Sequence, residues 1–446
     1  MRLCAVALWA ILLAPGLTAL AQPRIMTLEE VKNTALERNL NVIQAQNNYD
    51  AAGSGKLAAY GRYLPTLGAS GSWQRNQYEG PIYTSSGIAI PGSSSSQTVG
   101  SYSAGATASL TLFDGFYRES NLNRANAIAT QDNLSVTRTR QSIVFQVESG
   151  YLNILRMGQL VLVSEENLKR DRRQLERIEE SNRVGSLSLA DVYRQQSQVA
   201  ADELLLINSQ NDFNKGKADL VALIGLDMNQ EYVFADSTLA VQIDSVEVVA
   251  TRARYQSFDG LTRRALSARA DFQSVKVGLD AAQTGVTGAR SGYFPSLSAT
   301  AGLSLNNEEL SHLFDYKTMY WGVRLNWTLF DGFATNASIQ NAIATKRNAE
   351  ITLAQTELSI SVEVKKALLD LDAAMKQADV SQKGLVSASE DRKIAEERYN
   401  LGAGTLLDLL TANAAFVNAE ANVVNASYNY IIAKRNVEYV LGERAY

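Results

Sequence analysis

The chain has 446 residues, of which 46% are apolar and 20% are charged, and its net charge is -4. This balance is typical of a folded protein and excludes a largely disordered one. The slightly acidic charge offers no basic surface for a polyanion, so we expect no nucleic-acid partner.

The first 21 residues are typical of a secretory signal peptide. Arg2 precedes a long apolar run that ends in Ala-Leu-Ala at 19–21, which has the small-x-small form of a cleavage site. The alternative is a retained membrane anchor, because the run is nearly long enough to span a bilayer. The only cysteine, Cys4, lies inside this segment, so we expect a mature chain without disulfides or a lipidated cysteine. No later stretch predicts a transmembrane helix, which leaves a soluble, a peripheral or a β-barrel protein.

Two large parts of the chain repeat each other. Tyr-Leu-Pro-Thr-Leu at 63–67 recurs 230 positions later as Tyr-Phe-Pro-Ser-Leu at 293–297. Thr-Leu-Phe-Asp-Gly-Phe at 111–116 recurs in full 217 positions later at 328–333, and this second spacing holds to the end of the chain. Chance does not keep one register over more than a hundred residues, so an internal duplication is indicated.

The duplication predicts a division into four segments. We expect a signal peptide at 1–21, a first repeat at 22–226, an inter-repeat linker or equatorial segment at 227–256, and a second repeat at 257–446. Each repeat is expected to contain a helix, a β-hairpin and two long helices.

In the first repeat, a helix is predicted from Thr27 to about Tyr60. Thr27 and Glu30 have the spacing of a capping box at its start. Pro65, and Pro295 in the second repeat, end the preceding helix and admit an extended chain.

The segments that follow alternate between apolar and polar residues. Every second residue is apolar over 102–112, 297–305 and 321–329, which predicts strands about ten residues long. Strands of a soluble sheet have the same pattern, but Tyr102, Trp321 and Trp327 on the apolar faces favour a membrane barrel. The link over 76–100 is rich in serine and glycine and is predicted to be an external loop.

After each Asp-Gly the apolar period becomes helical. Val144, Val147, Tyr151 and Ile154 lie on one seam of a coiled coil. No breaker interrupts 118–183, a length of about 100 Å as a helix, and a second helix is predicted at 189–224. Compact domains do not need helices of this length, whereas a conduit through the periplasm does. The basic run at 169–173 is mixed with acidic residues and is interpreted as a solvated helix face.

Four strands per chain cannot close a barrel, and lipid does not tolerate open sheet edges. Closure therefore requires several copies of the chain, most simply in a cyclic ring. Three copies would supply twelve strands, although the arithmetic alone also allows two or four.

The duplicated layout, the motifs at 63–67 and 111–116 with their repeats, and the two glycine turns resemble the TolC-like outer-membrane efflux proteins. The resemblance covers nearly the whole mature chain. It implies an α+β membrane protein: a homotrimer with a twelve-stranded barrel in the outer-membrane lipid and an α-helical tunnel in the periplasm. It further implies a periplasmic adaptor (membrane fusion protein) and a proton-driven or ATP-driven inner-membrane pump as partners, and drugs, other small molecules or secreted proteins as cargo.

Two turns between long helices are the candidate functional sites. Their residues are Val184, Gly185, Ser186 and Leu187 in the first turn, and Leu401, Gly402, Ala403, Gly404 and Thr405 in the second. One interpretation is purely structural: a glycine ends one helix, and capping boxes at 188–191 and 405–408 start the next. The resemblance instead implies that both turns dock the adaptor.

The resemblance also implies a gate close to these turns. It places Asp408 in a carboxylate ring facing the pore, and Tyr399 in bonds that hold the entrance shut, with Asp191 as the expected partner. This sequence departs from the family pattern at Thr411, where a second acidic residue can occur, and at Gly404, where a basic one can. A doubled ring and an arginine latch are therefore not expected.

Two other classes of protein compete with the channel. A periplasmic coiled-coil adaptor or scaffold without a pore explains the long helices but not the two aromatic-bearing hairpins. An enzyme would need an acid–base cleft on Asp191 and Asp408, whose carboxylates already have a capping role. His312 is the only histidine, and we expect no cofactor and no metal.

Overall fold

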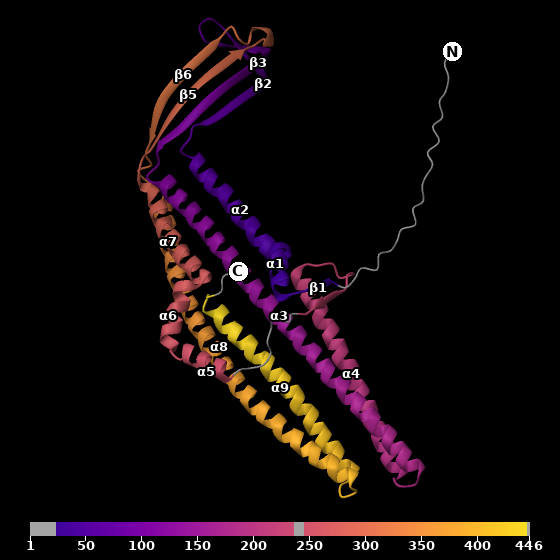
Figure 1. The fold of residues 1–446 in the computed structure, drawn as a ribbon. Coiled ribbons are helices and arrows are strands. Elements are labelled where there is room, and N and C mark those ends of the chain that lie inside the picture. The colour runs from indigo at the N-terminus through magenta and orange to yellow at the C-terminus, as the bar shows by residue number, and fades with distance from the viewer. Residues whose placement is uncertain (1–23, 236–244, 444–446) are drawn as a thin grey trace, which may run out of the picture. The chain divides into compact units, whose positions relative to one another are not determined.

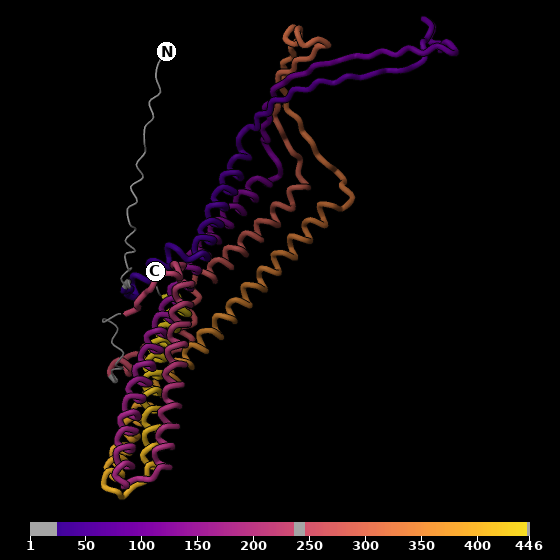
Figure 2. Tube along the Cα trace, turned by 90° about the vertical axis from the view of Figure 1, so that its right-hand side faces the viewer, coloured from indigo at the N-terminus to yellow at the C-terminus, as the bar shows by residue number. Residues whose placement is uncertain are grey.

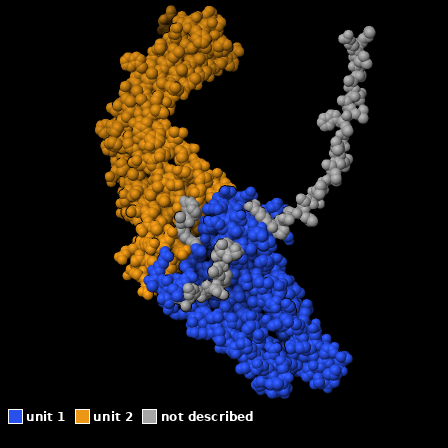
Figure 3. Space-filling view, in the orientation of Figure 1, with its two compact units in different colours: residues 1–40, 143–254, 370–436 blue, residues 41–142, 255–369, 437–446 orange. Residues whose placement is uncertain are grey.

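The computed structural model describes residues 24–235 and 245–443, so the predicted signal peptide at 1–21 lies outside it. The chain divides into two compact units, coloured separately in Figure 3. Unit 1 contains residues 1–40, 143–254 and 370–436, and unit 2 contains 41–142, 255–369 and 437–446. Each unit therefore combines segments of both sequence repeats. Within the described ranges, no helix is both long enough and apolar enough to cross a membrane.

Unit 2 carries a four-stranded antiparallel sheet (Figure 1). Its strands are β2 (Thr66–Tyr83), β3 (Ala89–Phe113), β5 (Ser296–Asn307) and β6 (Lys317–Asn326), in the order β2-β3-β5-β6. The central pair, β3 and β5, joins the two repeats, with Leu110 opposite Ala299. The predicted hairpins are thus confirmed, and they form one sheet.

The external loop predicted over 76–100 is wrong. β2 and β3 pair without interruption from Thr66↔Ser109 to Pro81↔Ser94, which leaves a short connection after Tyr83. Apolar alternation reveals only the part of a strand that meets an apolar surface, whereas backbone hydrogen bonds hold a serine-rich ladder equally well. The end of β6 at Asn326 also excludes Trp327 from the strand predicted over 321–329.

The repeated Asp-Gly-Phe turns at 114–116 and 331–333 have the same geometry. Both phenylalanines have a positive φ, 71° at Phe116 and 69° at Phe333, which is rare for a residue other than glycine. In each turn the aspartate accepts a hydrogen bond from the backbone N–H four residues later, at 3.3 and 2.7 Å. The motif therefore connects the end of a strand to the first turn of a long helix.

The helix predicted from Thr27 to Tyr60 is broken into α1 (Leu28–Arg38) and α2 (Leu40–Gly61). The capping box at Thr27 is confirmed, but Asn39 has an extended backbone, and its side-chain amide donates to the carbonyl of Leu223 at 2.7 Å. The second repeat has the same break, at Arg269, between α6 (Phe258–Ala268) and α7 (Ala270–Arg290). Tertiary contacts cause this interruption, since no helix breaker occurs at either site.

Two pairs of long helices complete the repeats (Figures 1 and 2). α3 (Tyr117–Arg183) is followed by α4 (Leu189–Ile224), and α8 (Ala334–Asn400) is followed by α9 (Leu406–Val440). The predicted bounds of the first pair are confirmed. The predicted seam is also confirmed, because its four residues from Val144 to Ile154 are no more than 5% exposed.

Short elements of unit 1 pack against these helices. β1 (Arg24–Met26) pairs in parallel with β4 (Tyr232–Phe234), and the hydroxyl of Tyr151 donates to the carbonyl of Met26. α5 (Ser245–Arg254) contacts α9, where Lys434 forms an ion pair of 2.6 Å with Glu247.

In unit 2, two 3₁₀ turns, η1 (Ser291–Tyr293) and η2 (Leu310–His312), flank β5.

Candidate functional site

The turn between α3 and α4, called here the first tip, consists of residues 184–187. Its glycine, Gly185, has a φ of +77°. The N–H of Ser186 donates to the carbonyl of Ser181, and the N–H of Gly185 donates to that of Asn182, both at 2.9 Å. These two bonds define a Schellman motif, which satisfies the last carbonyls of α3 and requires a left-handed residue at the glycine.

The turn between α8 and α9, the second tip, consists of residues 401–405 and repeats this geometry. Gly402 has a φ of +72°, the N–H of Ala403 donates to the carbonyl of Arg398 at 2.8 Å, and that of Gly402 donates to Tyr399 at 3.0 Å. Both tips lie at the same end of unit 1 (Figure 1). The structural interpretation of the glycines is therefore confirmed at both tips.

A capping interaction starts the helix after each tip. The N–H of Asp408 donates to Oγ1 of Thr405 at 3.1 Å, and the N–H of Thr405 donates back to the Asp408 carboxylate at 3.0 Å. These hydrogen bonds from the Thr405 backbone and hydroxyl, with the charge of Arg398, lower the pKa of Asp408. The exposed carboxylate of Asp408 therefore keeps its negative charge to a lower pH than an ordinary aspartate does.

Asp191 is bound within its own helix pair. Its carboxylate accepts from the hydroxyl of Ser188 at 2.8 Å and from the guanidinium of Arg194 at 3.1 Å. The structure places no hydrogen bond between Asp191 and Tyr399 within the described part of this chain. Asp191 nevertheless lies close enough to Tyr399 for its charge to raise the tyrosine pKa.

Tyr399 belongs to an apolar cluster that joins the two helix pairs just behind the tips. The cluster core is Ile178 of α3, Val192 of α4 and Leu406 of α9, and Tyr399 packs against it. The tyrosine is half-buried with its hydroxyl shielded from solvent; Gln174 lies within reach of the hydroxyl, but no hydrogen bond of good geometry forms among the described residues. Burial is the main cause of its raised pKa. A polar group without a partner at this depth is costly, so a partner from another chain would stabilise it.

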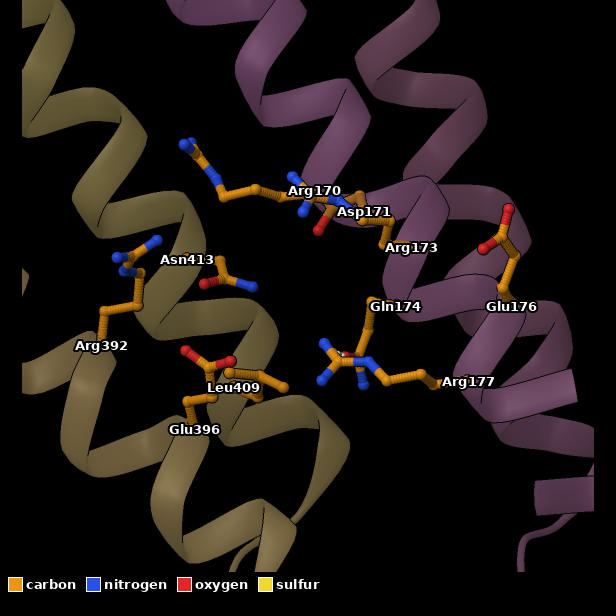
Figure 4. Close-up of a pocket in the computed structure, with 10 residues that line it drawn as sticks. All are labelled: Arg170, Asp171, Arg173, Gln174, Glu176, Arg177, Arg392, Glu396, Leu409 and Asn413. Carbon is orange, nitrogen blue, oxygen red and sulfur yellow. Dashed lines mark hydrogen bonds between the residues drawn. The ribbon is translucent and has the colours of Figure 1, made fainter. Parts of the chain in front are cut away.

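Sequence reasoning missed a groove next to this cluster (Figure 4). It has a volume of about 580 Å³ and lies between α3 on one side and α8 and α9 on the other. Two of its lining residues contact one aromatic ring: Arg392 lies 4.1 Å and Arg170 lies 5.5 Å from the centroid of Phe416. Arg170 also pairs with Glu420 at 3.6 Å.

The interpretation of 169–173 as a solvated face is wrong for one residue. Asp171 is only 2% exposed, whereas the next two residues, Arg172 and Arg173, are exposed. The signal was present in the spacing, since Leu168, Asp171, Leu175 and Ile178 follow the same 3-4-3 pattern as the apolar seam. Asp171 was overlooked as a core position in the sequence because the residues on either side of it are basic.

Comparisons with known proteins agree with this architecture. The family model described as outer membrane efflux protein matches residues 31–226 and 261–443. The outer membrane protein TolC of Vibrio cholerae serotype O1 is 24% identical over 426 residues, which cover 93% of this chain and 90% of the relative. The pyoverdine export outer membrane protein OpmQ of Pseudomonas aeruginosa is 25% identical over 414 residues, covering 92% and 82%.

A solved structure shows the same fold. The outer membrane protein VceC of Vibrio cholerae superposes with a TM-score of 0.78 at 17% identity, covering 93% of this chain and 96% of that one. All three are described as outer membrane proteins, OpmQ as one for pyoverdine export, and none is described as an enzyme or an adaptor. The chain thus belongs to the outer membrane efflux protein family and has its channel-tunnel fold, with its place in the outer membrane.

Proposed function

We propose that three copies of the chain form one export channel, which docks through its tips to a periplasmic adaptor and an inner-membrane pump. With a proton-driven pump the cargo is small toxic molecules; with an ATP-driven pump it is secreted proteins or small toxic molecules. The repeats at 22–226 and 257–446 each supply one β-hairpin and one long helix pair, and 227–256 joins them. The segment 1–21 is removed during secretion.

The exposed face of β6 is the observation that carries the barrel part of this proposal. Its odd-numbered residues are large, apolar and highly exposed: Met319 80%, Trp321 88%, Val323 65% and Leu325 64%. The opposite face carries Thr318, Tyr320, Gly322 and Arg324, of which only the tyrosine is large and aromatic, and it ends in a polar hydroxyl. A strand with one wide apolar face and one polar face is suited to lie between lipid and a wet lumen. The sheet order also leaves one edge of β2 and one of β6 open for a neighbouring copy.

A charge on the apolar face tests this arrangement. Trp321→Arg should cost about 2–4 kcal/mol if residue 321 lies near the bilayer midplane, and so deplete assembled channel from outer-membrane fractions. Thr318→Arg, on the face that already carries Arg324, is the matched control and should assemble normally. Equal assembly of both variants would contradict a lipid-facing β6. Chemical crosslinking of the unmodified channel should give a ladder that ends at three chains.

The tips are the proposed docking surface. Val184 and Leu401 are 70% and 83% exposed, and the backbone of each tip is already fixed by its Schellman motif. A partner can therefore bind these apolar side chains without an ordering cost for the turn.

Cysteine crosslinking in intact cells tests the docking. Ala403→Cys and Ser186→Cys are suitable sites, since both residues are exposed. Gly404 is less suitable, because a Cβ there would lie 3.2 Å from Cβ of Arg398. Ala344→Cys, an exposed position on α8 outside unit 1, is the control. Capture of an adaptor by the tip variants alone supports the proposal. A proton-driven pump recovered with the adaptor would establish small-molecule efflux, and an ATP-driven pump would point to secretion or ATP-driven drug export. Equal capture by all three variants would contradict it.

A further inference from the structure

We propose that Asp171 and Asp202 hold one proton between them, and that this buried proton-binding site locks α3 to α4 behind the first tip. Asp171 of α3 is 2% exposed and Asp202 of α4 is 5% exposed. The contacts of Arg172 with Glu203 and of Ser164 with Ser209 set Asp171 opposite Asp202 in the antiparallel α3–α4 pair. Asp202 is close enough to raise the pKa of Asp171. Two carboxylates at such a distance, both removed from water, cannot both remain ionised at low cost.

Two buried acceptor atoms next to the pair lack a hydrogen-bond donor among the described residues. Nε2 of Gln198 donates to Oδ1 of Asp202 at 3.1 Å, but Oδ2 of Asp202 is buried and has no partner among the described residues. Gln195 is fully buried, and its Nε2 donates to the backbone carbonyl of Asp171 at 3.1 Å, while its Oε1 also lacks a donor. A proton on Asp171 supplies the missing donor to Asp202.

Nearby cations do not neutralise the pair. The charge of Arg170, the preceding residue, lowers the pKa of Asp171, but by less than burial and Asp202 raise it. Arg170 is also engaged with Glu420 and the ring of Phe416. Arg172 pairs with Glu203 at 2.7 Å on the solvent side. The remaining charged groups around the Asp171 side of the groove are Arg173, Glu176 and Arg177 of α3 and Arg392 and Glu396 of α8. These last five carry a nearly balanced charge, so they provide little net compensation.

The second repeat lacks this site. At the spacing of 217 residues, Asp171 corresponds to Ala388 and Asp202 to Ala419, and buried Gln195 corresponds to buried Ala412. The α8–α9 pair therefore packs through small apolar residues where the α3–α4 pair buries three polar ones. Apolar residues are the cheaper choice for packing alone, so the polar set is suited to a response that alanine cannot give.

Burial and the hydrogen bond with Asp202 raise the pKa of Asp171 to about 7. The folded hairpin thus holds a proton that an opened, solvated hairpin releases at its ordinary pKa of 3.8. The stability that this proton adds is fully present below the pKa of the opened hairpin, 3.8. It is lost as the pH rises through the pKa of the folded hairpin, about 7. Asp171 lies twelve residues before the end of α3, about 18 Å from the first tip. Loss of the proton consequently weakens the packing of α3 against α4 behind the first tip.

Hydrogen exchange of the purified full-length channel tests this inference. After normalisation to intrinsic exchange rates, amides of α3 and α4 around the pair should open roughly 10- to 30-fold more often at about pH 8.5 than at about pH 5.5. Asp171→Asn cannot ionise and can still donate to Asp202, so its exchange should lose this pH dependence. Glu203→Gln, which removes an exposed carboxylate one residue from Asp202, should retain it. The α8–α9 pair should show no such change in any of the three proteins.

Infrared spectroscopy gives a second readout that does not depend on the variant's stability. The wild type should show a carbonyl band of a protonated carboxylic acid that titrates near neutral pH and is absent from Asp171→Asn and Asp202→Asn. If no band titrates between about pH 5 and about pH 9, the inference fails. It also fails if Asp171→Asn keeps the full pH dependence of exchange.

Discussion

Gly185 and Gly402 have the same left-handed backbone conformation at the same position of a Schellman motif, 217 residues apart. An added Cβ would meet no atom within 4 Å at either glycine, so space does not explain the choice of residue. The reason is the backbone, since a left-handed conformation is unfavourable for most L-residues. The glycines at the two tips are therefore required by the backbone conformation of the turn and not by packing against neighbouring side chains.

Replacement of either glycine should weaken its tip through the backbone alone. Gly402→Ala is expected to cost about 1 kcal/mol, and Gly402→Asn clearly less, because asparagine tolerates this conformation. Local hydrogen exchange at the end of α8 measures the effect. Gly384→Ala is the control: Gly384 lies in the interior of α8, also with open space, and its replacement should stabilise the helix by roughly 0.5–1 kcal/mol. Equal effects of alanine and asparagine at 402 would argue against a backbone cause.

Asp408 should set the ion preference of the proposed pore. Asp408→Asn removes three carboxylates from a trimeric ring and should reduce the preference for cations, as measured by the reversal potential in a salt gradient. The hydrogen bonds from Thr405 lower the pKa of Asp408, so the wild-type preference should persist as the pH falls to the ordinary aspartate value and disappear only below it. Glu390→Gln, which removes an exposed carboxylate paired with Lys393 on α8, should leave the preference unchanged.

Much of the fold was predictable because it depends on local and repeated signals. The long helices α3 and α4 begin and end at glycine, serine and aspartate signals that the sequence states directly. The break at Asn39 was not predictable, since it depends on a contact with Leu223 at the far end of the repeat. The continuation of β2 and β3 through 76–100 was equally hidden, because a serine-rich ladder has no apolar period.

The candidate site was predictable in its backbone and not in its contacts. Spacing alone indicated the capping of Asp408 by Thr405. The apolar cluster around Tyr399 and the cation–ring contacts of Phe416 combine helices that lie far apart in the sequence. The apolar period of a single helix does not predict which side chains of different helices meet, because those contacts depend on how the helices pack.

Tyr399→Phe should distinguish a gate from a purely structural tyrosine. If the hydroxyl bonds to a neighbouring chain in the closed channel, its loss should increase the conductance of the resting channel in planar bilayers. If it has no partner, the variant should keep its conductance and gain a little stability, because a buried hydroxyl without a partner is destabilising. Tyr193→Phe is the control, since Tyr193 of α4 is 61% exposed and should change neither property.

Arg269 should be among the most sensitive positions of unit 2. Its side chain is 3% exposed and forms ion pairs of 2.6 Å with both Asp271 and Glu363. Burial opposes ionisation of Asp271, but the hydrogen bonds from Arg269 and the charge of Arg138 outweigh it, and the pKa of Asp271 is lowered. The ionised Asp271 therefore stabilises the fold above the ordinary aspartate pKa, and this contribution is lost as the pH falls through the lowered value.

Arg269→Met removes the cation that Asp271 and Glu363 share, while Arg138 still pairs with Asp271 at 3.4 Å, and should cost about 1.5–3 kcal/mol. We expect a large decrease in the thermal-unfolding midpoint, measured at one fixed heating rate, and a smaller loss of stability on acidification than in the wild type. Arg264→Met removes an ion pair of 3.0 Å with Glu443, but that arginine side chain is 57% exposed. Its cost should stay within about 1 kcal/mol, because exposed pairs are screened by solvent. Similar midpoints for the two variants would show that burial of Arg269 does not govern the strength of its ion pairs.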